Sequence, residues 1–184
     1  MKRIAIIGAG QSGLHLGLGL LAKGYEVTIY SDRSAEGILA GPVMSSQCMF
    51  DSALDAERTL GLNLWEEECP KVEGMGFAVP DGFGGKVVDW ATRLDDHAQS
   101  VDQRVKIPRW MAEFERRGGE LCIKVADLDD LELCARSHDL VIVAAGKGTI
   151  GQLFEHDAGR SRFDTPQRAL ALTYVRNMVP RQPF

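Results

Sequence analysis

A glycine-rich segment near the start of the sequence has the composition of a phosphate-binding turn. The apolar run at residues 3–7 leads directly into Gly8-Ala9-Gly10-Gln11-Ser12-Gly13, and a helix-forming stretch follows. In a GxGxxG pattern the first glycine allows a tight turn, the second admits a diphosphate, and the third lets the helix pack on the strand. The N-terminus of that helix presents backbone N–H groups to phosphate oxygens. We therefore predict that a dinucleotide diphosphate is bound by Gly8, Gly10, Gln11, Ser12 and Gly13.

The end of the second predicted strand carries the residues that would recognise an adenosine ribose. Residues 26–30 form that strand, and Ser31-Asp32-Arg33 follow it. A carboxylate at this place hydrogen-bonds the ribose hydroxyls of FAD or NAD, whereas a serine beside an arginine suits the 2′-phosphate of NADPH. A solvated turn without a ligand is a further interpretation. These residues alone leave the choice of dinucleotide open.

Composition and charge argue against some classes of partner. The 184 residues carry a net charge of −5 at pH 7, which disfavours nucleic acid or an anionic membrane surface as the main partner. No uninterrupted apolar run approaches the length that spans a membrane. The 4 cysteines and 4 histidines are scattered without a metal-binding pattern. We expect a cytoplasmic protein that binds a small molecule and no metal.

The order of the predicted elements indicates an α/β fold with a parallel sheet. Strands are expected over residues 3–7, 26–30, 120–125 and 139–145, and helices over 14–23, 53–61, 102–117 and 127–136. The strand at 139–145 is so apolar that we expect it to be buried on both faces. Residues 76–80 and 86–91 flank a glycine-rich turn and predict an inserted antiparallel hairpin. One further strand is predicted over 168–178.

Two features together favour FAD over a nicotinamide cofactor. The apolar strand at 139–145 ends in Ala145-Gly146-Lys147-Gly148, whose small residues let the backbone pass close to a cofactor. A strand of this type closes the nucleotide domain of flavoprotein monooxygenases. The inserted hairpin fits the same architecture and fits a plain nicotinamide-binding domain poorly.

Several stretches of the chain resemble the styrene and indole monooxygenase family, which comprises flavin-dependent epoxidases related in fold to the hydroxybenzoate hydroxylases. The more specific stretches are GLHLGL at 13–18 and PQRAL at 166–170. The others lie at 27–33, 101–104, 114–119 and 139–147. The sequence Tyr30-Ser31-Asp32-Arg33 also looks like this family's version of the second strand, which weakens the case for NADPH.

The resemblance implies a Rossmann-like FAD-binding parallel sheet, similar to that of hydroxybenzoate hydroxylase, with an inserted antiparallel substrate-domain hairpin. Residues 1–64 and 99–165 would form the discontinuous FAD-binding domain, and residues 65–98 and 166–184 an incomplete substrate-binding sheet. Ser31, Asp32 and Arg33 would approach the adenosine ribose. Arg104 would bind a phosphate or support the isoalloxazine ring, and Gly146 would lie beside the cofactor.

The activity implied by the resemblance is that of the oxygenase component of a two-component FAD-dependent monooxygenase. Such a protein receives reduced FAD from a separate NADH-dependent flavin reductase and epoxidises an aromatic alkene or an indole-like substrate. The protein supplies binding, orientation and exclusion of water, so no catalytic acid–base pair is assigned. A homodimer is one expected assembly. The alternatives are an NAD(P)-linked oxidoreductase and a truncated nucleotide-binding remnant without catalysis.

The chain departs from the family pattern in two places. The loop at 41–46, which the family places near the flavin ring, lacks the Asn-Thr pair of the styrene-type enzymes, so the substrate stays undetermined. The rest of the substrate sheet, a Gly-Asp motif that contacts the flavin and a terminal helical region would follow residue 184 in the family. We therefore expect a chain that is truncated at its C-terminus: either a fragment, or a shortened product that is catalytically weak or inactive.

Overall fold

The computed structural model describes residues 1–44, 47–146 and 157–165, together with Ile150, Leu153, Glu155, Gln167, Ala169, Asn177 and Val179. The chain divides into two compact units. The first contains Met1–Met44 and Asp102–Leu170, and the second contains Ser45–Val101 and Ala171–Phe184. The strand predicted over 168–178 lies mostly outside the described residues. Among those that are described, no helix has both the length and the apolar character needed to cross a membrane.

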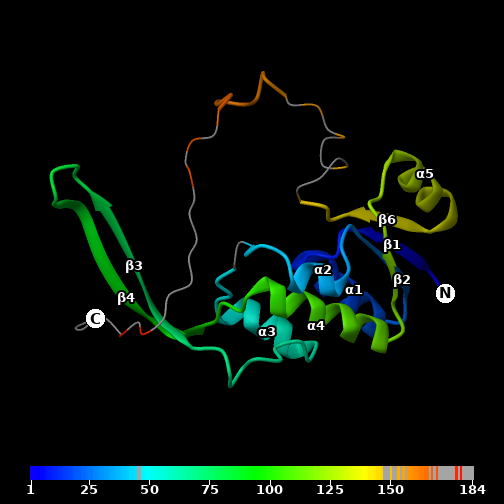
Figure 1. Cartoon of the computed structure of the whole chain (residues 1–184), viewed down its shortest axis with the longest axis horizontal. Helices are drawn as coiled ribbons and strands as arrows, with labels where there is room; N and C mark the ends of the chain where they lie inside the picture. The colour runs from blue at the N-terminus through cyan, green and yellow to red at the C-terminus, as the bar shows by residue number, and fades with distance from the viewer. Residues whose placement is uncertain are drawn as a thin grey trace. The chain divides into compact units, whose positions relative to one another are not determined.

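The first unit is built on a four-stranded parallel sheet (Figure 1). Its strands are β1 (Arg3–Ile7), β2 (Glu26–Ser31), β5 (Glu120–Ile123) and β6 (Leu140–Val143), in the order β5-β2-β1-β6. The chain leaves β1 toward β2 on one side and later returns to pair β6 with the other side of β1. Parallel α/β sheets bind ligands at such a switch point, beyond the carboxyl ends of the strands.

Helices cover both faces of this sheet, as the alternating sequence pattern predicts (Figure 1). Helices α1 (Gln11–Ala22) and α4 (Gln103–Arg116) cover one face. A β-carbon built on Gly17 of α1 would lie 2.7 Å from Cδ1 of Ile29 and 3.0 Å from Cε2 of Phe114. Helix α5 (Leu128–Ser137) covers the opposite face, where its buried Cys134 packs in a cluster with Ala5 and Ile7. The predicted α/β class is therefore confirmed.

The prediction that the strand at 139–145, now β6, is buried on both faces is wrong. Within the described residues β6 pairs only with β1 and forms an edge of the sheet. Leu140 is 51% exposed and Val143 is 42% exposed. Val141 packs against the cluster beneath α5, and Ile142 on the opposite face is half-buried, so each face of the strand is only partly covered. An apolar run shows that a strand is in a sheet, but it does not show how many neighbours the strand has.

Local sequence explains where the helices of the first unit begin and end. Helix α1 ends at Ala22; Gly24, just beyond the C-cap, has a φ of +81° that suits glycine, and the N–H of Tyr25 donates to the carbonyl of Leu20 at 3.2 Å. Helix α5 begins with a capping box in which the side chains and backbone N–H groups of Asp127 and Asp130 pair reciprocally. The short helix α2 (Ala35–Leu39) was not predicted, because five residues carry too little periodicity.

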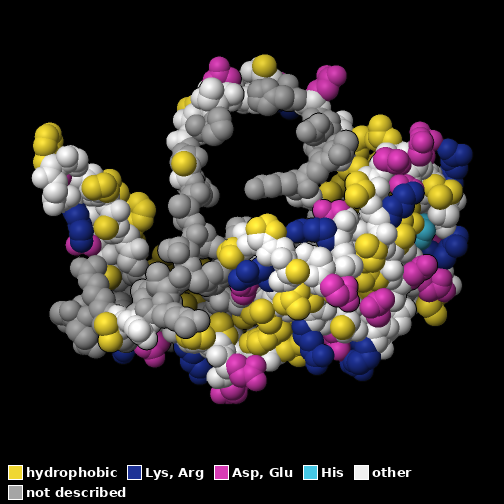
Figure 2. Space-filling model, viewed as in Figure 1, with side chains coloured by type: hydrophobic (Ala, Val, Ile, Leu, Met, Phe, Trp, Pro, Cys, Tyr) yellow, Lys and Arg dark blue, Asp and Glu magenta, His cyan; other side chains and the backbone are white. Residues whose placement is uncertain are grey.

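The second unit contains helix α3 (Asp51–Thr59) and a long hairpin formed by β3 (Val72–Pro80) and β4 (Lys86–Ala98). The hairpin extends further than the predicted strands. Phe77 lies opposite Trp90, and both rings are about half exposed, at 55% and 45%. Hydrophobic side chains are visible along this hairpin in Figure 2. The inserted antiparallel element is therefore present and carries an open apolar surface.

Candidate functional site

The carboxyl ends of β1, β2 and β6 bring the predicted binding segments to one edge of the sheet. Ile7 is in register with Tyr30 of β2 and with Val143 of β6. The N–H of Gly8 donates to the carbonyl of Tyr30 at 2.9 Å, and the N–H of Ala144 donates to the carbonyl of Ile7 at 2.8 Å. The structure therefore gathers residues 8–13, 31–33 and Gly146 at the switch point. Residues 147 and 148 of the small-residue run lie outside the described part of the chain.

Two of the three motif glycines are required by the packing of the turn itself. Gly8 has a φ of +119°, and a β-carbon there would stand 2.6 Å from the carbonyl oxygen of Ala144. A β-carbon on Gly13 would overlap the carbonyl oxygen of Gly8. Both obstacles are backbone atoms, which cannot rotate aside as a side chain can. Any larger residue at either position would displace the strand end or the helix.

The remaining motif glycine, Gly10, faces open space. No heavy atom lies within 4 Å of a β-carbon built there. Gly10 is also the N-cap of α1, with no capping side chain and no acidic residue in the first turn of the helix. The N-terminus of a helix in this state attracts anions through its N–H groups and its dipole. The turn therefore fits a diphosphate in space and in charge.

The last residue of β2 closes a turn, and the side chains of the two residues that follow it are accessible to solvent. Ser31 is 2% exposed, and its hydroxyl donates to the carbonyl of Arg33 at 2.7 Å. The side chain of Asp32 is 67% exposed and that of Arg33 is 43% exposed, with Nε of Arg33 3.6 Å from Oδ1 of Asp32. An adenosine ribose at this edge would meet the carboxylate of Asp32, whereas the Ser31 hydroxyl is already engaged.

Arg104 lies in the first turn of α4, where it pairs with the N-cap residue Asp102. Its Nη2 lies 2.6 Å from Oδ2 of Asp102 and its Nε lies 3.1 Å from the same oxygen. The side chain of Asp102 also accepts the N–H of Arg104 at 2.9 Å. Hydrogen bonding by Arg104 holds the pKa of Asp102 below its usual value. Much of the hydrogen-bonding capacity of the Arg104 guanidinium is therefore taken up by Asp102.

The sequence pattern missed Gln103, a buried residue beside the glycine turn. Gln103 is 6% exposed, and its Nε2 donates to Oε1 of Gln11 at 3.1 Å. This amide pair joins the first residue of α4 to the first residue of α1. A glutamine at a helix start resembles an ordinary surface residue in sequence. Only the packing of α1 beside α4 shows that it belongs to the site.

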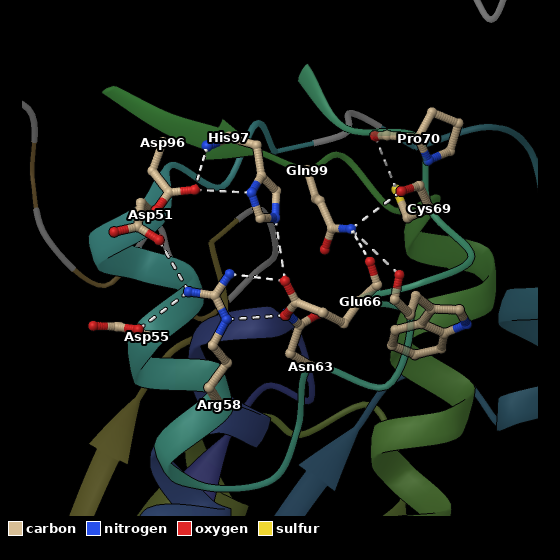
Figure 3. A network of polar contacts seen from close by, with 11 residues as sticks. Asp51, Asp55, Arg58, Asn63, Glu66, Cys69, Pro70, Asp96, His97 and Gln99 are labelled. Carbon is tan, nitrogen blue, oxygen red and sulfur yellow. Dashed lines mark hydrogen bonds and ion pairs between the residues drawn. The ribbon is translucent and has the colours of Figure 1, made fainter. Parts of the chain in front are cut away.

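A polar network in the second unit is centred on Arg58 of α3 and Glu66 (Figure 3). Nε and Nη2 of Arg58 each donate to a carboxylate oxygen of Glu66 at 2.9 Å. Nη1 of Arg58 also donates to Asp51 at 2.9 Å and to Asp55 at 3.1 Å. Arg58 accordingly lowers the pKa of Glu66 to about 2, with a smaller contribution from His97.

The same network connects the chain after α3 to the end of β4 (Figure 3). Nε2 of His97 lies 3.1 Å from Oε1 of Glu66, and Nδ1 of His97 lies 2.9 Å from Oδ1 of Asp96. Gln99 is 1% exposed, and its Nε2 donates to the carbonyl of Glu66 at 2.9 Å and to that of Cys69 at 3.1 Å. We interpret this network as a structural clamp within the second unit.

Sequence comparison relates the chain to styrene monooxygenases. Styrene monooxygenase StyA of Pseudomonas fluorescens is 33% identical over 171 residues, which are 93% of this chain and 40% of StyA. StyA of another Pseudomonas species gives the same values. The chain belongs to the styrene monooxygenase A family. The family model described as "Styrene monooxygenase A putative substrate binding domain" matches residues 146–184. This member of the styrene monooxygenase A family spans 40% of the length of both relatives.

Solved structures show that this styrene monooxygenase A family member shares its fold with halogenases. The flavin-dependent halogenase CmlS matches 70% of the chain with a TM-score of 0.54 at 21% identity, over 24% of its own length. The flavin-dependent brominase Bmp2 matches 66% of the chain with a TM-score of 0.52 at 15% identity, over 29% of its own length. These likenesses confirm the predicted Rossmann-like architecture with an inserted hairpin.

Proposed function

We propose that this chain binds reduced FAD and forms part of the oxygenase component of a two-component monooxygenase. The observation that carries the proposal is the glycine turn at the β1/β6 switch point, in a chain 33% identical to styrene monooxygenase StyA. The proposed reaction is oxygenation of an aromatic alkene or an indole-like substrate. Reduced FAD would come from a separate NADH-dependent flavin reductase, as the family relationship suggests.

The first unit would hold the ADP half of FAD. The diphosphate would lie over Gly10 and accept hydrogen bonds from the backbone N–H groups at the start of α1. The exposed carboxylate of Asp32 would accept hydrogen bonds from the adenosine ribose. Gly146 supports the same placement, because its φ of +50° and the open space around it leave room for a ligand beside β6.

Bound reduced FAD would supply the oxygen-activating chemistry, as cofactors do for reactions that side chains cannot perform. The residues of this chain would bind and orient the cofactor through the glycine turn and Asp32. We assign no general acid or base, because no part of this role requires one.

The second unit would contribute to the substrate surface. The paired rings of Phe77 and Trp90 and the adjacent pair Val79 and Val88 lie on one face of the hairpin. An exposed apolar face of this kind is typical of a binding surface. The substrate-binding family model that matches residues 146–184 supports the same assignment for the end of the chain.

Ligand titration tests the proposal directly. The purified chain would be titrated under anaerobic conditions with reduced FAD, oxidised FAD, NADH and NADPH, and binding followed by calorimetry and flavin fluorescence. We expect reduced FAD to bind more tightly than either nicotinamide dinucleotide. A preference for NADH or NADPH would contradict the proposal, and so would failure to bind any flavin. A flavin-binding chain would next be supplied with a flavin reductase, NADH and styrene or indole, and the epoxide or indole oxidation product measured.

A further inference from the structure

Strand β5 forms one edge of the parallel sheet in the first unit. Among the described residues it pairs only with β2, so no described strand lies along its other side. The N–H of Lys124 donates to the carbonyl of Ser31 on β2 at 2.7 Å. Because successive residues of a strand direct their backbone groups to opposite sides, those of Leu121 and Ile123 point away from β2. This open edge can therefore accept a further strand.

The side chains along this edge are complementary to a second copy of the same strand. Lys124 binds Asp130 of α5 at 2.6 Å, so its side chain lies on the face that α5 covers. Side chains two residues apart share a face, which places Glu120 and Cys122 on that face as well. Glu120 and Lys124 are equally far from Cys122 in sequence. In an antiparallel pair of β5 strands centred on Cys122, each Glu120 would therefore lie opposite the Lys124 of the other copy.

The same register also matches the backbone groups of the two copies. It sets Leu121 of one copy opposite Ile123 of the other, and these are the residues whose N–H and carbonyl groups point to the open edge. Such a pair exchanges both of its backbone hydrogen bonds. A shift of one residue would set outward-pointing groups against inward-pointing ones. The Cys122 residues would form the non-hydrogen-bonded pair on the two-fold axis, with their Cα atoms about 4.5 Å apart.

We propose that β5 pairs in the antiparallel direction with β5 of a second copy of this chain, with Cys122 on the two-fold axis. The exposed apolar side chains of Ile123 and Val125, at 49% and 68%, favour a covered edge at the end of this strand. A strand pair of this length buries less area than a standard protein interface, so the dimer is weak and forms at high chain concentration. The contact uses only the first unit and needs no bound flavin.

Oxidative cross-linking tests the position of the axis. The expected separation of the Cys122 Cα atoms lies within the range of about 4.4–6.8 Å that a disulfide spans. Diamide would take up the two thiol hydrogens as the disulfide forms. The variant Cys48→Ser lacks the exposed thiol of Cys48 and should give a covalent dimer on a non-reducing gel. Adding Cys122→Ser should abolish this dimer, whereas adding Cys69→Ser, the matched control, should leave it.

Charge reversal at the two ends of the strand tests the register. Glu120→Lys would set lysines opposite each other across the axis, and Lys124→Glu would set glutamates opposite each other. Either variant alone should dimerise about tenfold more weakly than the unsubstituted chain. An equal mixture restores opposite charges in the mixed dimer, so sedimentation of the mixture should show more dimer than either variant alone.

The mixture also controls for effects within one chain. Glu120 accepts a hydrogen bond from the hydroxyl of Thr28 at 2.9 Å, and Lys124 binds Asp130, so each substitution changes a contact inside the fold. These losses are the same in the mixture and in the separate variants, and they cannot produce a recovery on mixing. Thermal unfolding of each variant would confirm that the chains remain folded.

Four results would overturn the proposal. They are an unsubstituted chain that stays monomeric at every soluble concentration, a covalent dimer that survives Cys122→Ser, charge-reversed variants that dimerise as well as the unsubstituted chain, and a mixture that dimerises no better than its components. A dimer with any of the last three properties would use another surface of the chain. Flavin titration is independent of all these measurements, so failure of the proposed function would be recognised separately.

Discussion

Gly13 packs against Gly8 so closely that a β-carbon on Gly13 would overlap the carbonyl oxygen of Gly8. The carbonyl of Gly8 leaves no room for a side chain at the third glycine of the motif. Both glycines therefore allow α1 to pack closely on β1. Gly10 has a different role, because the space around it is open. The motif thus combines two positions needed for the fold with one position left free for a ligand.

Alanine substitutions at Gly13 and Gly10 should separate these two roles. Gly13→Ala is expected to lower the free energy of unfolding by about 3 kcal/mol, because backbone atoms must move. Gly10→Ala should cost at most about 1 kcal/mol, from the poorer N-cap, but should weaken FAD binding because its β-carbon occupies the diphosphate space. Chemical denaturation and FAD titration of both variants measure these effects. Equal stability of the two variants would contradict the packing argument.

Substitutions at Ser31, the last residue of β2, and at Asp32, which follows it, should also differ in their effects. Ser31→Ala should lower the free energy of unfolding by about 1 kcal/mol through loss of the hydrogen bond to Arg33. Asp32→Asn should leave stability unchanged and weaken binding of FAD by about tenfold, because a neutral amide is a poorer acceptor for ribose hydroxyls. The measurements are thermal unfolding and flavin titration. Normal FAD binding by Asp32→Asn would remove Asp32 from the proposed site.

Arg104 is expected to act through Asp102 rather than through a direct phosphate contact. Arg104→Met should weaken reduced-FAD binding by about threefold to tenfold, because it leaves the Asp102 carboxylate uncompensated at the start of α4. Adding Asp102→Asn removes that charge and keeps a good N-cap, so the double variant should recover most of the affinity. Calorimetric titration of reduced FAD measures both steps. A double variant as weak as Arg104→Met would instead indicate that Arg104 touches the cofactor.

The pairing of Glu66 with Arg58 should make the stability of the second unit depend on pH. The pKa of Glu66 is lowered from 4.5 to about 2, so the unfolded chain binds a proton more readily than the folded chain in this range. The stabilisation is fully present above about pH 5 and is lost as pH falls from about 4.5 to about 2. The stability difference between the unsubstituted chain and Glu66→Gln should therefore shrink over that interval.

Hydrogen exchange of amides in α3 and β4, measured between pH 2 and pH 6, would follow this loss. Glu67→Gln, at the exposed neighbouring glutamate, serves as the charge-matched control. Other carboxylates with a lowered pKa, such as Glu113, contribute equally to all three proteins and cancel in the differences. A stability difference that stays constant down to pH 2 would show that the ion pair does not contribute.

Some features of the chain could be predicted because they depend on neighbouring residues. The GxGxxG turn, the Asp127 cap and the glycine-rich hairpin turn each follow from backbone geometry that a few residues impose. The FAD-type architecture was also recognisable, since segments such as residues 13–18 and 166–170 resemble the styrene and indole monooxygenase family. The expectation that β6 is buried on both faces failed, because the position of a strand in the sheet depends on how distant segments pair.

The sequence by itself determined the glycine-rich turn after β1, the alternation of strands and helices, and the family of the chain. Only the tertiary structure decided that β1 lies between β2 and β6, which places three distant segments at one edge. It also decided that the guanidinium of Arg104 pairs with Asp102 and that the side-chain amide of Gln103 donates to that of Gln11. The physical reason is that propensity and periodicity are local, whereas a hydrogen bond between residues 92 positions apart requires the fold to bring two helices together.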